Sequence, residues 1–194
     1  NMDEPLGHKI GNSLEIYESI ETLKGKGPSD LVEVCVEIGA HLLIDAKLYD
    51  NFEEAKKALV GTLTDQSAFN KFKELVIAQG GDISVVENPE LLIQAPTYKL
   101  LARKSGYLEK IITSEVGVAA RVLGAGRLTK EDRLDLEVGI DLHKKIGDKI
   151  SKGDLIATIY HHDKGLEEAI LILEKALIIG KNKKEVRLIE KTIK

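Results

Sequence analysis

The sequence predicts a protein of the α+β class, because helical and strand patterns occupy different parts of the chain. In about the first 80 positions, apolar residues recur at the spacing of amphipathic helices. After Pro96, short apolar runs of strand type alternate with helical segments. Gly-Asp occurs at residues 147–148 and again at 153–154, which predicts short strands joined by sharp turns. Helices followed by a mixed region are typical of α+β proteins.

Capping residues mark the helices of the first part. Asn12 with Glu15, and Asn51 with Glu54, have the spacing of a capping box, in which the two side chains satisfy backbone N–H groups of the first turn. The expected helices cover about residues 12–23, 28–46, 51–63 and 69–80. Glycines follow the first and the last of them, as at many helix ends.

The second of these helices is apolar on nearly all sides, so we expect it to be buried on most of them. The rest of the helical part hardly provides the neighbours that such a helix needs. Cys35 is the single cysteine and cannot form an internal disulfide; its pattern predicts a small buried side chain rather than a reactive thiol. His41 is predicted to be a hydrogen-bonded interior histidine rather than a metal ligand.

Residues 82–95 are predicted to connect the two parts, since Asn88-Pro89 and Ala95-Pro96 force non-helical backbone before each proline. The elements expected beyond them are strands at 98–102 and 107–112 around a turn at 104–106, a helix at 114–123, strands at 138–142 and 155–160, a helix at 166–179 and a last strand at 185–189. The second part therefore mixes strands and helices.

The Gly147–Asp154 segment resembles the turn pattern of biotinyl and lipoyl carrier domains, which are flattened β-sandwiches. Such carriers present a modifiable lysine on an exposed hairpin, in a Met-Lys-Met or Asp-Lys context. The only methionine is Met2, and Asp163-Lys164 is followed by Gly165 and a helical pattern rather than a returning strand. A sandwich scaffold without a prosthetic group is therefore favoured over a carrier.

Three other motifs have a structural interpretation that we favour over a functional one. The glycines of Leu123–Asp132 follow a helix, so helix C-capping explains them better than a phosphate loop, which needs a strand before it. His161 and His162 are adjacent on a strand and point to opposite faces, so an exposed strand end is favoured over a shared metal ion. Lys181–Lys184 is predicted to be a solvated turn.

Composition excludes several classes of partner. A formal net charge of -4 offers no basic field for nucleic acid or for an anionic membrane. No apolar run approaches the roughly 20 residues that span a bilayer, and the first residues show no signal-peptide pattern. We therefore expect a cytoplasmic protein without a nucleic-acid or membrane partner. We also expect no organic cofactor.

Short motifs occur in a fixed order along both parts of the chain. They are Pro5–Glu15, Lys104–Tyr107, Gly117–Ala119, Leu123–Arg127, Thr129–Asp132, Val138–Ile140 and Lys144–Asp148. Together they resemble the pyrimidine-nucleoside phosphorylases, the family that includes thymidine phosphorylase, over essentially all 194 residues. By this resemblance, the chain is expected to begin inside a domain and to be the C-terminal portion of an enzyme.

The resemblance implies three regions. Residues 1–81 would be the later, helical part of the family's α/β domain, without its parallel sheet. Residues 82–95 would be a linker, and residues 96–194 the family's C-terminal α+β domain with a biotinyl/lipoyl-like, barrel-sandwich core. The second helix would then pack on a sheet that is not in this chain.

The same resemblance implies an enzyme of nucleoside salvage. The family exchanges the glycosidic bond of a pyrimidine nucleoside for a bond to phosphate, which yields free base and pentose 1-phosphate. Its phosphate cradle is a Lys-His-Ser-Thr-Gly-Gly type loop, and an Arg, a Ser and a Lys clamp the base; neither that loop nor an equivalent occurs here. We therefore assign no catalytic residue, expect the chain alone to be inactive, and expect the full-length protein to be a homodimer.

One site of the family reaches into this chain. Bacterial members can hold a monovalent metal ion, potassium, near the phosphate loop, and hard cations prefer oxygen ligands. By position, the resemblance assigns to this ion the main-chain carbonyls of Leu6 and Lys9 and the carboxylate of Glu18. Family members often have alanine where Lys9 stands, a change that keeps a carbonyl ligand but adds an ammonium nearby.

Two alternatives to an enzyme fragment follow from the same residues. One is a carrier or binding module of biotinyl/lipoyl type, which a modified lysine on an exposed strand would favour. The other is a structural protein with only the non-catalytic half of the family, which a native start at Met2 would favour. Thymidine and uridine preference are not separable, because the base clamp is not in these residues.

Overall fold

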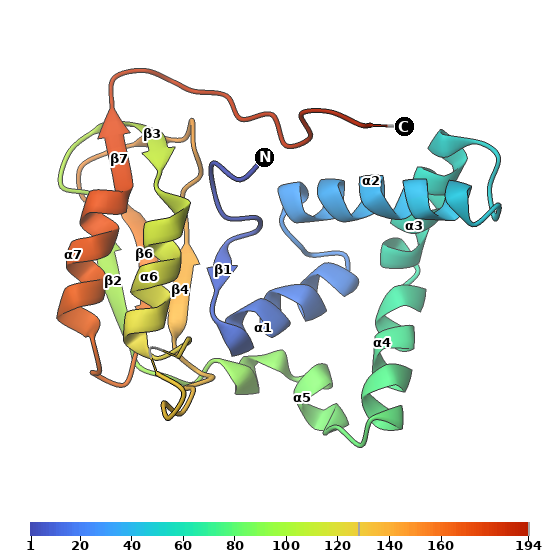
Figure 1. Ribbon diagram of the computed structural model, residues 1–194, viewed down its shortest axis with the longest axis horizontal. Helices are drawn as coiled ribbons and strands as arrows, with labels where there is room; N and C mark the ends of the chain where they lie inside the picture. The colour runs from blue at the N-terminus through green and yellow to red at the C-terminus, as the bar shows by residue number, and fades with distance from the viewer. Residues whose placement is uncertain (128, 194) are drawn as a thin grey trace. The chain divides into compact units, whose positions relative to one another are not determined.

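The computed structural model describes residues 1–127 and 129–193, so Leu128 of the glycine-rich motif and Lys194 lie outside the described residues (Figure 1). The chain forms two compact units. The larger unit comprises Asn1–Ile16 and Leu92–Lys194, and the smaller unit comprises Tyr17–Leu91. The division falls within α1 (Asn12–Leu23), so this helix belongs to both units.

Two antiparallel sheets form the frame of the larger unit, within the part of the chain that the structure describes. The first sheet has the order β1-β4-β6-β2, with bounds Lys9–Ile10, Gly139–Leu142, Leu155–Tyr160 and Thr97–Leu101. The second has the order β5-β3-β7, with bounds Lys149–Ile150, Gly106–Ile111 and Leu177–Gly180. With helices α6 (Thr113–Leu123) and α7 (Leu166–Ala176), the sheets confirm the predicted α+β class.

A single hydrophobic cluster joins the sheets and helices of this unit, in which α6 and α7 lie side by side (Figure 1). Large side chains from every layer are at most 2% exposed, among them Leu108, Leu123, Ile140, Ile159 and Leu173. Complete burial of each such side chain stabilises the fold by roughly 1.5–3 kcal/mol. Leucine and isoleucine thus build the core of a protein that has no tryptophan.

The strands predicted on either side of Lys104–Gly106 are present but do not pair with each other. β2 pairs with β6, whereas β3 pairs with β5 and β7 in the other sheet. Ala102 bonds instead with the second Gly-Asp turn: its N–H donates to Asp154 O at 2.8 Å, and its carbonyl accepts from the N–H of Gly153 at 2.8 Å. Strand propensity marks both segments, but distant residues decide their partners.

The C-terminal elements differ from the prediction. The helix expected to reach residue 179 ends at Ala176, and Leu177–Gly180 forms β7. The strand expected at 185–189 is wrong, because that described segment contains no strand. Leu177 and Ile179 are 6% and 7% exposed around Ile178 at 39%, which is the alternation of a strand. A continuous apolar run conceals this change of period.

Helices build the smaller unit. After α1 come α2 (Ser29–Asp45), α3 (Phe52–Thr64), α4 (Ser67–Ala78), α5 (Ile83–Glu87) and the 3-10 helix η1 (Pro89–Leu92). The predicted cap of α3 is confirmed, because Asn51 Oδ1 accepts from the N–H of Glu54 at 3.1 Å. The connection predicted at 82–95 contains two short helices, α5 and η1. Asn88 between them is non-helical, as predicted for the residue before a proline.

The start of α1 uses its capping residues differently from the prediction. Asn12 is the first residue of the helix, and its amide donates to Ala125 O at 2.8 Å, so its assignment as N-cap is wrong. Glu15 does reach back, but it accepts from the N–H of Gly11 at 3.0 Å. The acidic side chain still satisfies a backbone donor at the helix start, as in a capping box.

α2 is less buried than the sequence predicts. Val36 and Ala40 are buried, but Ile38 and Leu42 are 57% and 63% exposed. Cys35 is exposed as well, so the prediction of a buried thiol is wrong. Packing against α3 buries one side of the helix, and an apolar pattern as wide as this one would need a second layer to be buried throughout.

His41 of α2 is partly exposed, so the prediction of a hydrogen-bonded interior histidine is wrong. Its ring packs against Phe52 with centroids 4.6 Å apart, and its Nε2 lies 3.8 Å from Glu37 Oε1. Glu37 also accepts from Lys56 Nζ of α3 at 2.8 Å, and this hydrogen bond raises the pKa of Lys56. Glu37 and His41 of α2 thus contact Lys56 and Phe52 of α3, and these contacts tie the two helices together.

Two further predictions concern membrane-spanning helices and the division of the chain into regions. No helix in residues 1–127 or 129–193 is long and apolar enough to cross a membrane. The compact units reflect contacts, whereas the regions 1–81, 82–95 and 96–194 follow from a family resemblance, and that division stays a prediction.

Candidate functional site

The N-terminal segment is held against β4 by close backbone pairing. β1 runs antiparallel to β4, with Lys9 opposite Asp141. A Cβ on Gly139 of β4 would lie 2.2 Å from Ile10 O, so only glycine allows the strands to approach this closely. The pairing fixes the position of the first residues of the chain within the larger unit.

Contacts before β1 anchor the residues around Leu6. Glu4 Oε2 accepts from the N–H of Ile146 at 2.8 Å, and Lys145 Nζ donates to Pro5 O. The Leu6 side chain is 44% exposed and follows these contacts directly. Its carbonyl therefore belongs to a segment that is fixed on both sides.

Lys9 directs its side chain and its carbonyl to different places. Lys9 Nζ lies 2.5 Å from Asp141 Oδ2, and the two side chains are only 15% and 13% exposed. The N–H of Leu142 donates to His8 O at 2.8 Å, so the next pair, Lys9 and Asp141, is of the non-hydrogen-bonded kind. The carbonyl of Lys9 thus points away from β4, while Asp141 neutralises its ammonium.

Polar side chains continue this row across the first sheet. Asp141 is opposite Thr158 of β6, which is opposite Lys99 of β2, and His143 Nε2 lies 2.7 Å from Thr158 Oγ1. Burial chiefly lowers the pKa of His143, and nearby cationic groups add to this effect against Asp141. Within the described ranges, no three His, Cys, Asp or Glu side chains gather to hold a metal ion. Two pairs of side chains in this row thus bond to each other: Lys9 to Asp141, and His143 to Thr158.

His161 and His162 follow the end of β6 at Tyr160, outside the strand in which they were predicted, and they have separate partners. His161 is 9% exposed, and its Nδ1 lies 3.5 Å from Asp163 Oδ1. His162 Nδ1 lies 2.7 Å from Asp135 Oδ2, and its Nε2 lies 3.9 Å from Glu137 Oε2. The hydrogen bond to Asp135 chiefly raises the pKa of His162. The predicted exposure is therefore right for His162, which lies just beyond the strand, and wrong for His161, which is buried.

The glycine-rich motif is a helix C-cap, as predicted. Gly124 has φ +114°, and its N–H donates to Arg121 O at 3.0 Å. The N–H of Ala125 donates to Ala120 O at 3.1 Å, which completes the left-handed ending that glycine favours. The motif closes α6 rather than opening a helix that would cradle a phosphate.

The two Gly-Asp pairs form matching turns around β5, which confirms the predicted sharp corners. In each, the aspartate accepts the N–H of the residue three positions before it at 2.9 Å. The glycine before each aspartate has positive φ, +95° at Gly147 and +93° at Gly153. A side chain at either position would be strained, so glycine is required there.

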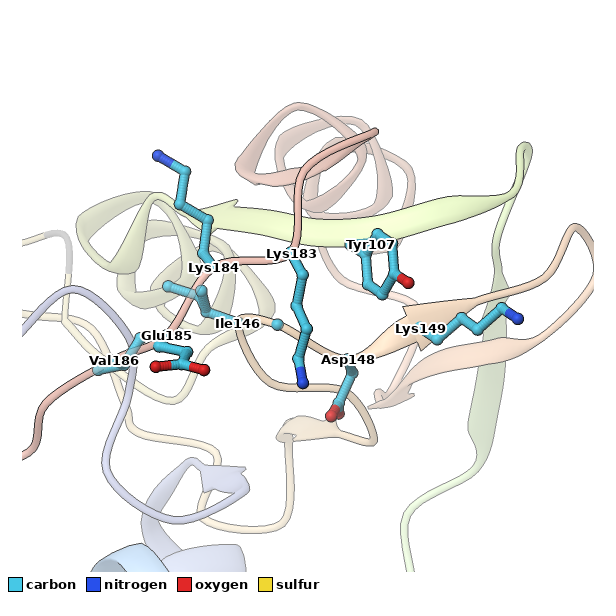
Figure 2. Close-up of a pocket in the computed structure, with 9 residues that line it drawn as sticks. Tyr107, Ile146, Asp148, Lys149, Lys183, Lys184, Glu185 and Val186 are labelled. Atoms are coloured by element: carbon cyan, nitrogen blue, oxygen red, sulfur yellow. The ribbon is translucent and has the colours of Figure 1, made fainter.

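A cavity of about 660 Å³ lies beside the first of these turns (Figure 2). Its lining residues are Tyr107 of β3, Ile146–Lys149 of the turn and β5, and Lys183–Val186 after β7. Sequence patterns predict only a solvated turn at Lys181–Lys184 and give no sign of this cavity. The pairing of β3 with β5 and β7 brings its walls together, and that pairing leaves no local signal in the sequence.

Lys164 is not displayed as the lysine of a carrier domain would be. It follows Asp163, with φ +65°, in the turn before α7, and Gly165 caps that helix with φ +66°. A Cβ on Gly165 would lie 2.4 Å from Val122 O, so the turn packs against α6. The Asp-Lys pair therefore starts a helix and does not form the tip of a β-hairpin.

Comparison with known proteins connects this fold to a family. Residues 107–180 match the model of the pyrimidine nucleoside phosphorylase C-terminal domain. The pyrimidine-nucleoside phosphorylases of Staphylococcus aureus strains USA300 and COL are both 41% identical to this chain over 196 residues, which cover 100% of the chain and 45% of each relative. The chain belongs to the pyrimidine-nucleoside phosphorylase family. It spans about 45% of the length of the curated relatives that it matches and corresponds to their C-terminal part.

The phosphorylase C-terminal domain model covers the elements that build the core. Residues 107–180 begin in β3 and end with β7, and they include α6, α7, β4, β5 and β6. The glycine-rich cap and both Gly-Asp turns lie in this range. Most of the motifs that suggested the family from sequence thus lie in its C-terminal domain, whereas Pro5–Glu15 lies before it.

The three residues assigned to a phosphorylase cation lie in different compact units. Leu6 and Lys9 belong to the larger unit and Glu18 to the smaller. Glu18 is 7% exposed, and its carbonyl accepts from Thr22 Oγ1 at 2.7 Å. Carbonyl and carboxylate oxygens suit a hard cation, and the ammonium of Lys9 is already neutralised by Asp141. The ligand atoms are thus of the type that such an ion prefers, and the assignment of Leu6, Lys9 and Glu18 stays a prediction.

Proposed function

We propose that this chain is the C-terminal part of a pyrimidine-nucleoside phosphorylase. The whole enzyme would exchange the C–N bond between a pyrimidine and its pentose for a C–O bond to phosphate, giving free base and pentose 1-phosphate. The observation that carries the proposal is the 41% identity along the entire chain to proteins of that name. The match of residues 107–180 to the family's C-terminal domain supports it.

In this proposal the chain supplies a scaffold rather than catalytic groups. Transfer of a pentose to phosphate needs fixed donors around the phosphate, and positioning provides much of the rate. The family's Lys-His-Ser-Thr-Gly-Gly type loop does not occur in the 194 residues. We therefore expect the chain alone to lack phosphorylase activity.

A potassium ion forms part of the proposal. Leu6 and Lys9 would hold it through their main-chain carbonyls and Glu18 through its carboxylate, and the ion would supply positive charge near the phosphate. The Lys9–Asp141 pair supports this assignment, because it removes the lysine charge that would oppose a cation. The direction of the Lys9 carbonyl, away from β4, supports it as well.

The remaining features of the proposal follow from the family alone. The substrates would be a pyrimidine nucleoside and phosphate, and the full-length protein would be a cytoplasmic homodimer that acts in nucleoside salvage. Sedimentation of the full-length protein would test the dimer.

A chimera tests the proposed division of labour. The N-terminal part of a Staphylococcus aureus relative, which this chain does not match, would be joined to this chain. Release of free base from uridine and from thymidine would then be followed with phosphate present. We expect activity in the chimera and none in the chain alone.

Two other outcomes of this experiment would contradict parts of the proposal. Activity in the chain alone would overturn the placement of the catalytic groups outside it. A chimera that melts cooperatively but cleaves neither nucleoside would contradict the phosphorylase proposal.

A further inference from the structure

The cavity beside Tyr107 holds positive charge that the protein does not neutralise. Over residues 1–127 and 129–193, the ammonium groups of Lys149, Lys183 and Lys184 form no ion pair or hydrogen bond. Asp148 and Glu185 also line the cavity, so its lining residues include three lysines and two acidic residues. Such a mixed lining offers both cations for an anionic group and acceptors for hydroxyl groups.

The acidic Asp148 is already engaged by the backbone. Its Oδ2 accepts from the N–H of Lys145 at 2.9 Å, which leaves it less able to satisfy the lysines. Figure 2 shows Lys183 extending in the direction of Asp148, on the same side of the cavity, whereas Lys184 extends away. Lys183 is therefore the cation best placed to meet a ligand.

Backbone contacts set the walls of the cavity. A Cβ on Gly147 would lie 2.3 Å from Lys184 O, because the segment after β7 crosses directly over the turn. The N–H of Asn182 donates to Glu109 Oε1 at 2.5 Å, and the N–H of Gly147 donates to Leu108 O at 2.8 Å. Both walls are thus fastened to β3, so the cavity does not need a ligand to form.

We propose that this cavity binds a small phosphate ester that carries hydroxyl groups, a sugar phosphate by chemical class. Lys183 meets the phosphate in charge-assisted hydrogen bonds, and Glu185 accepts hydrogen bonds from the sugar. The Tyr107 hydroxyl donates a further one. A volume of about 660 Å³ is in the range of small-molecule sites.

Both signs of charge in the lining favour this class over a simple anion. Inorganic phosphate would use only the lysines and would be repelled by Glu185, whereas a sugar gives that carboxylate hydroxyl donors. The inference does not depend on the proposed phosphorolysis, because the family's phosphate loop is not in this chain.

Ribose 5-phosphate is the probe for the first test, with inorganic phosphate and ribose as separate arms. Each is titrated into the isotope-labelled 194-residue chain while amide signals are followed by NMR. We expect saturable binding of ribose 5-phosphate, tighter than that of either fragment, with shifts at residues 147–149 and 183–186. Equal affinity for inorganic phosphate, or shifts confined to other segments, would overturn the proposal.

A pair of lysine variants separates a specific site from general charge attraction. Lys183→Gln removes a cation that lines the cavity, and Lys181→Gln removes the same charge from an exposed residue that does not line it. We expect Lys183→Gln to weaken ribose 5-phosphate binding about three- to fivefold, the scale of one solvent-accessible ion pair. Lys181→Gln should leave the affinity unchanged, and equal losses in both variants would contradict the site.

Discussion

The two compact units differ in how their apolar helices are covered. In the larger unit, α7 buries Ala169, Leu173 and Ala176 completely, because it packs on α6 and next to the second sheet. In the smaller unit, α2 has an apolar sequence on nearly all sides but leaves Ile38 and Leu42 more than half exposed. An apolar helix face therefore predicts a helix reliably, whereas its burial depends on a second layer that the helix itself does not specify.

Truncating one leucine in each unit should produce the largest difference between them. Leu173→Ala removes a side chain that is 0% exposed, and we expect a loss of about 2–5 kcal/mol from the free energy of unfolding. Leu42→Ala, at a position that is 63% exposed, should change it by no more than about 0.5 kcal/mol. Urea unfolding followed by circular dichroism measures both, and similar losses would contradict the contrast.

Two glycine variants test the close approach of β1 to β4 in the larger unit. Gly139→Ala would place a methyl group 2.2 Å from Ile10 O, and we expect the forced separation to cost about 1–3 kcal/mol of stability. Gly117→Ala is the control, because no atom lies within 4 Å of its added Cβ in α6. It should stabilise the protein by about 0.5–1 kcal/mol. Thermal unfolding would show the opposite signs, and a neutral Gly139→Ala would refute the tight pairing.

A cap variant gives a smaller effect that is local to the smaller unit. Asn51→Ala removes the acceptor for the N–H of Glu54, and we expect α3 to lose about 1 kcal/mol. Amide hydrogen exchange should accelerate in the first turn of α3 but not in the core strands of the larger unit. Equal acceleration in both units would mean that they do not unfold independently.

Signals within a few residues predicted much of this fold, and distant contacts account for what was missed. The Asn51 cap, the Gly124 ending and the two Gly-Asp turns depend on neighbours in sequence, and all were predicted. β7 was missed because its strand alternation is hidden in the apolar run that also forms α7. Helix pattern alone also overestimated the burial of Cys35.

The candidate sites depend even more on contacts between residues that are far apart in the sequence. No spacing rule pairs Lys9 with Asp141, which are 132 residues apart in the chain. The lysines of the cavity looked like a solvated turn, because Tyr107 and the Gly-Asp turn reach them only through sheet pairing. Leu6, Lys9 and Glu18 came from family resemblance, since the main-chain carbonyls of Leu6 and Lys9 carry no side-chain signature and a single glutamate is not specific.

Changes of pH should give the smallest effects on stability. They act through two histidines of the larger unit, His162 and His143. The hydrogen bond to Asp135 raises the pKa of His162 above 6.5, so its stabilisation is complete below pH 6.5 and is lost as pH rises through the higher folded value. Burial lowers the pKa of His143 below 6.5, so stability falls as pH drops through 6.5 toward that lower value.

Histidine variants separate these opposite slopes. His162→Gln should reduce the fall in melting temperature between pH 6.5 and about 8, and His143→Gln should reduce the fall below pH 6.5. Melting curves across this range provide the measurement. A wild-type slope above pH 6.5 in His162→Gln would rule out the Asp135 hydrogen bond as its source.

The pairing of β1 with β4 has a consequence for the order of folding during synthesis. Residues of the larger unit enclose those of the smaller unit in the chain, and Lys9 meets a partner 132 positions later. As the ribosome extends the polypeptide, residues 17–91 emerge as one continuous stretch of helices, while the first strand still has no neighbour to pair with. Residues 17–91 can therefore fold before residues 1–16 find their partners, and β1 joins the first sheet only after β4 has been translated.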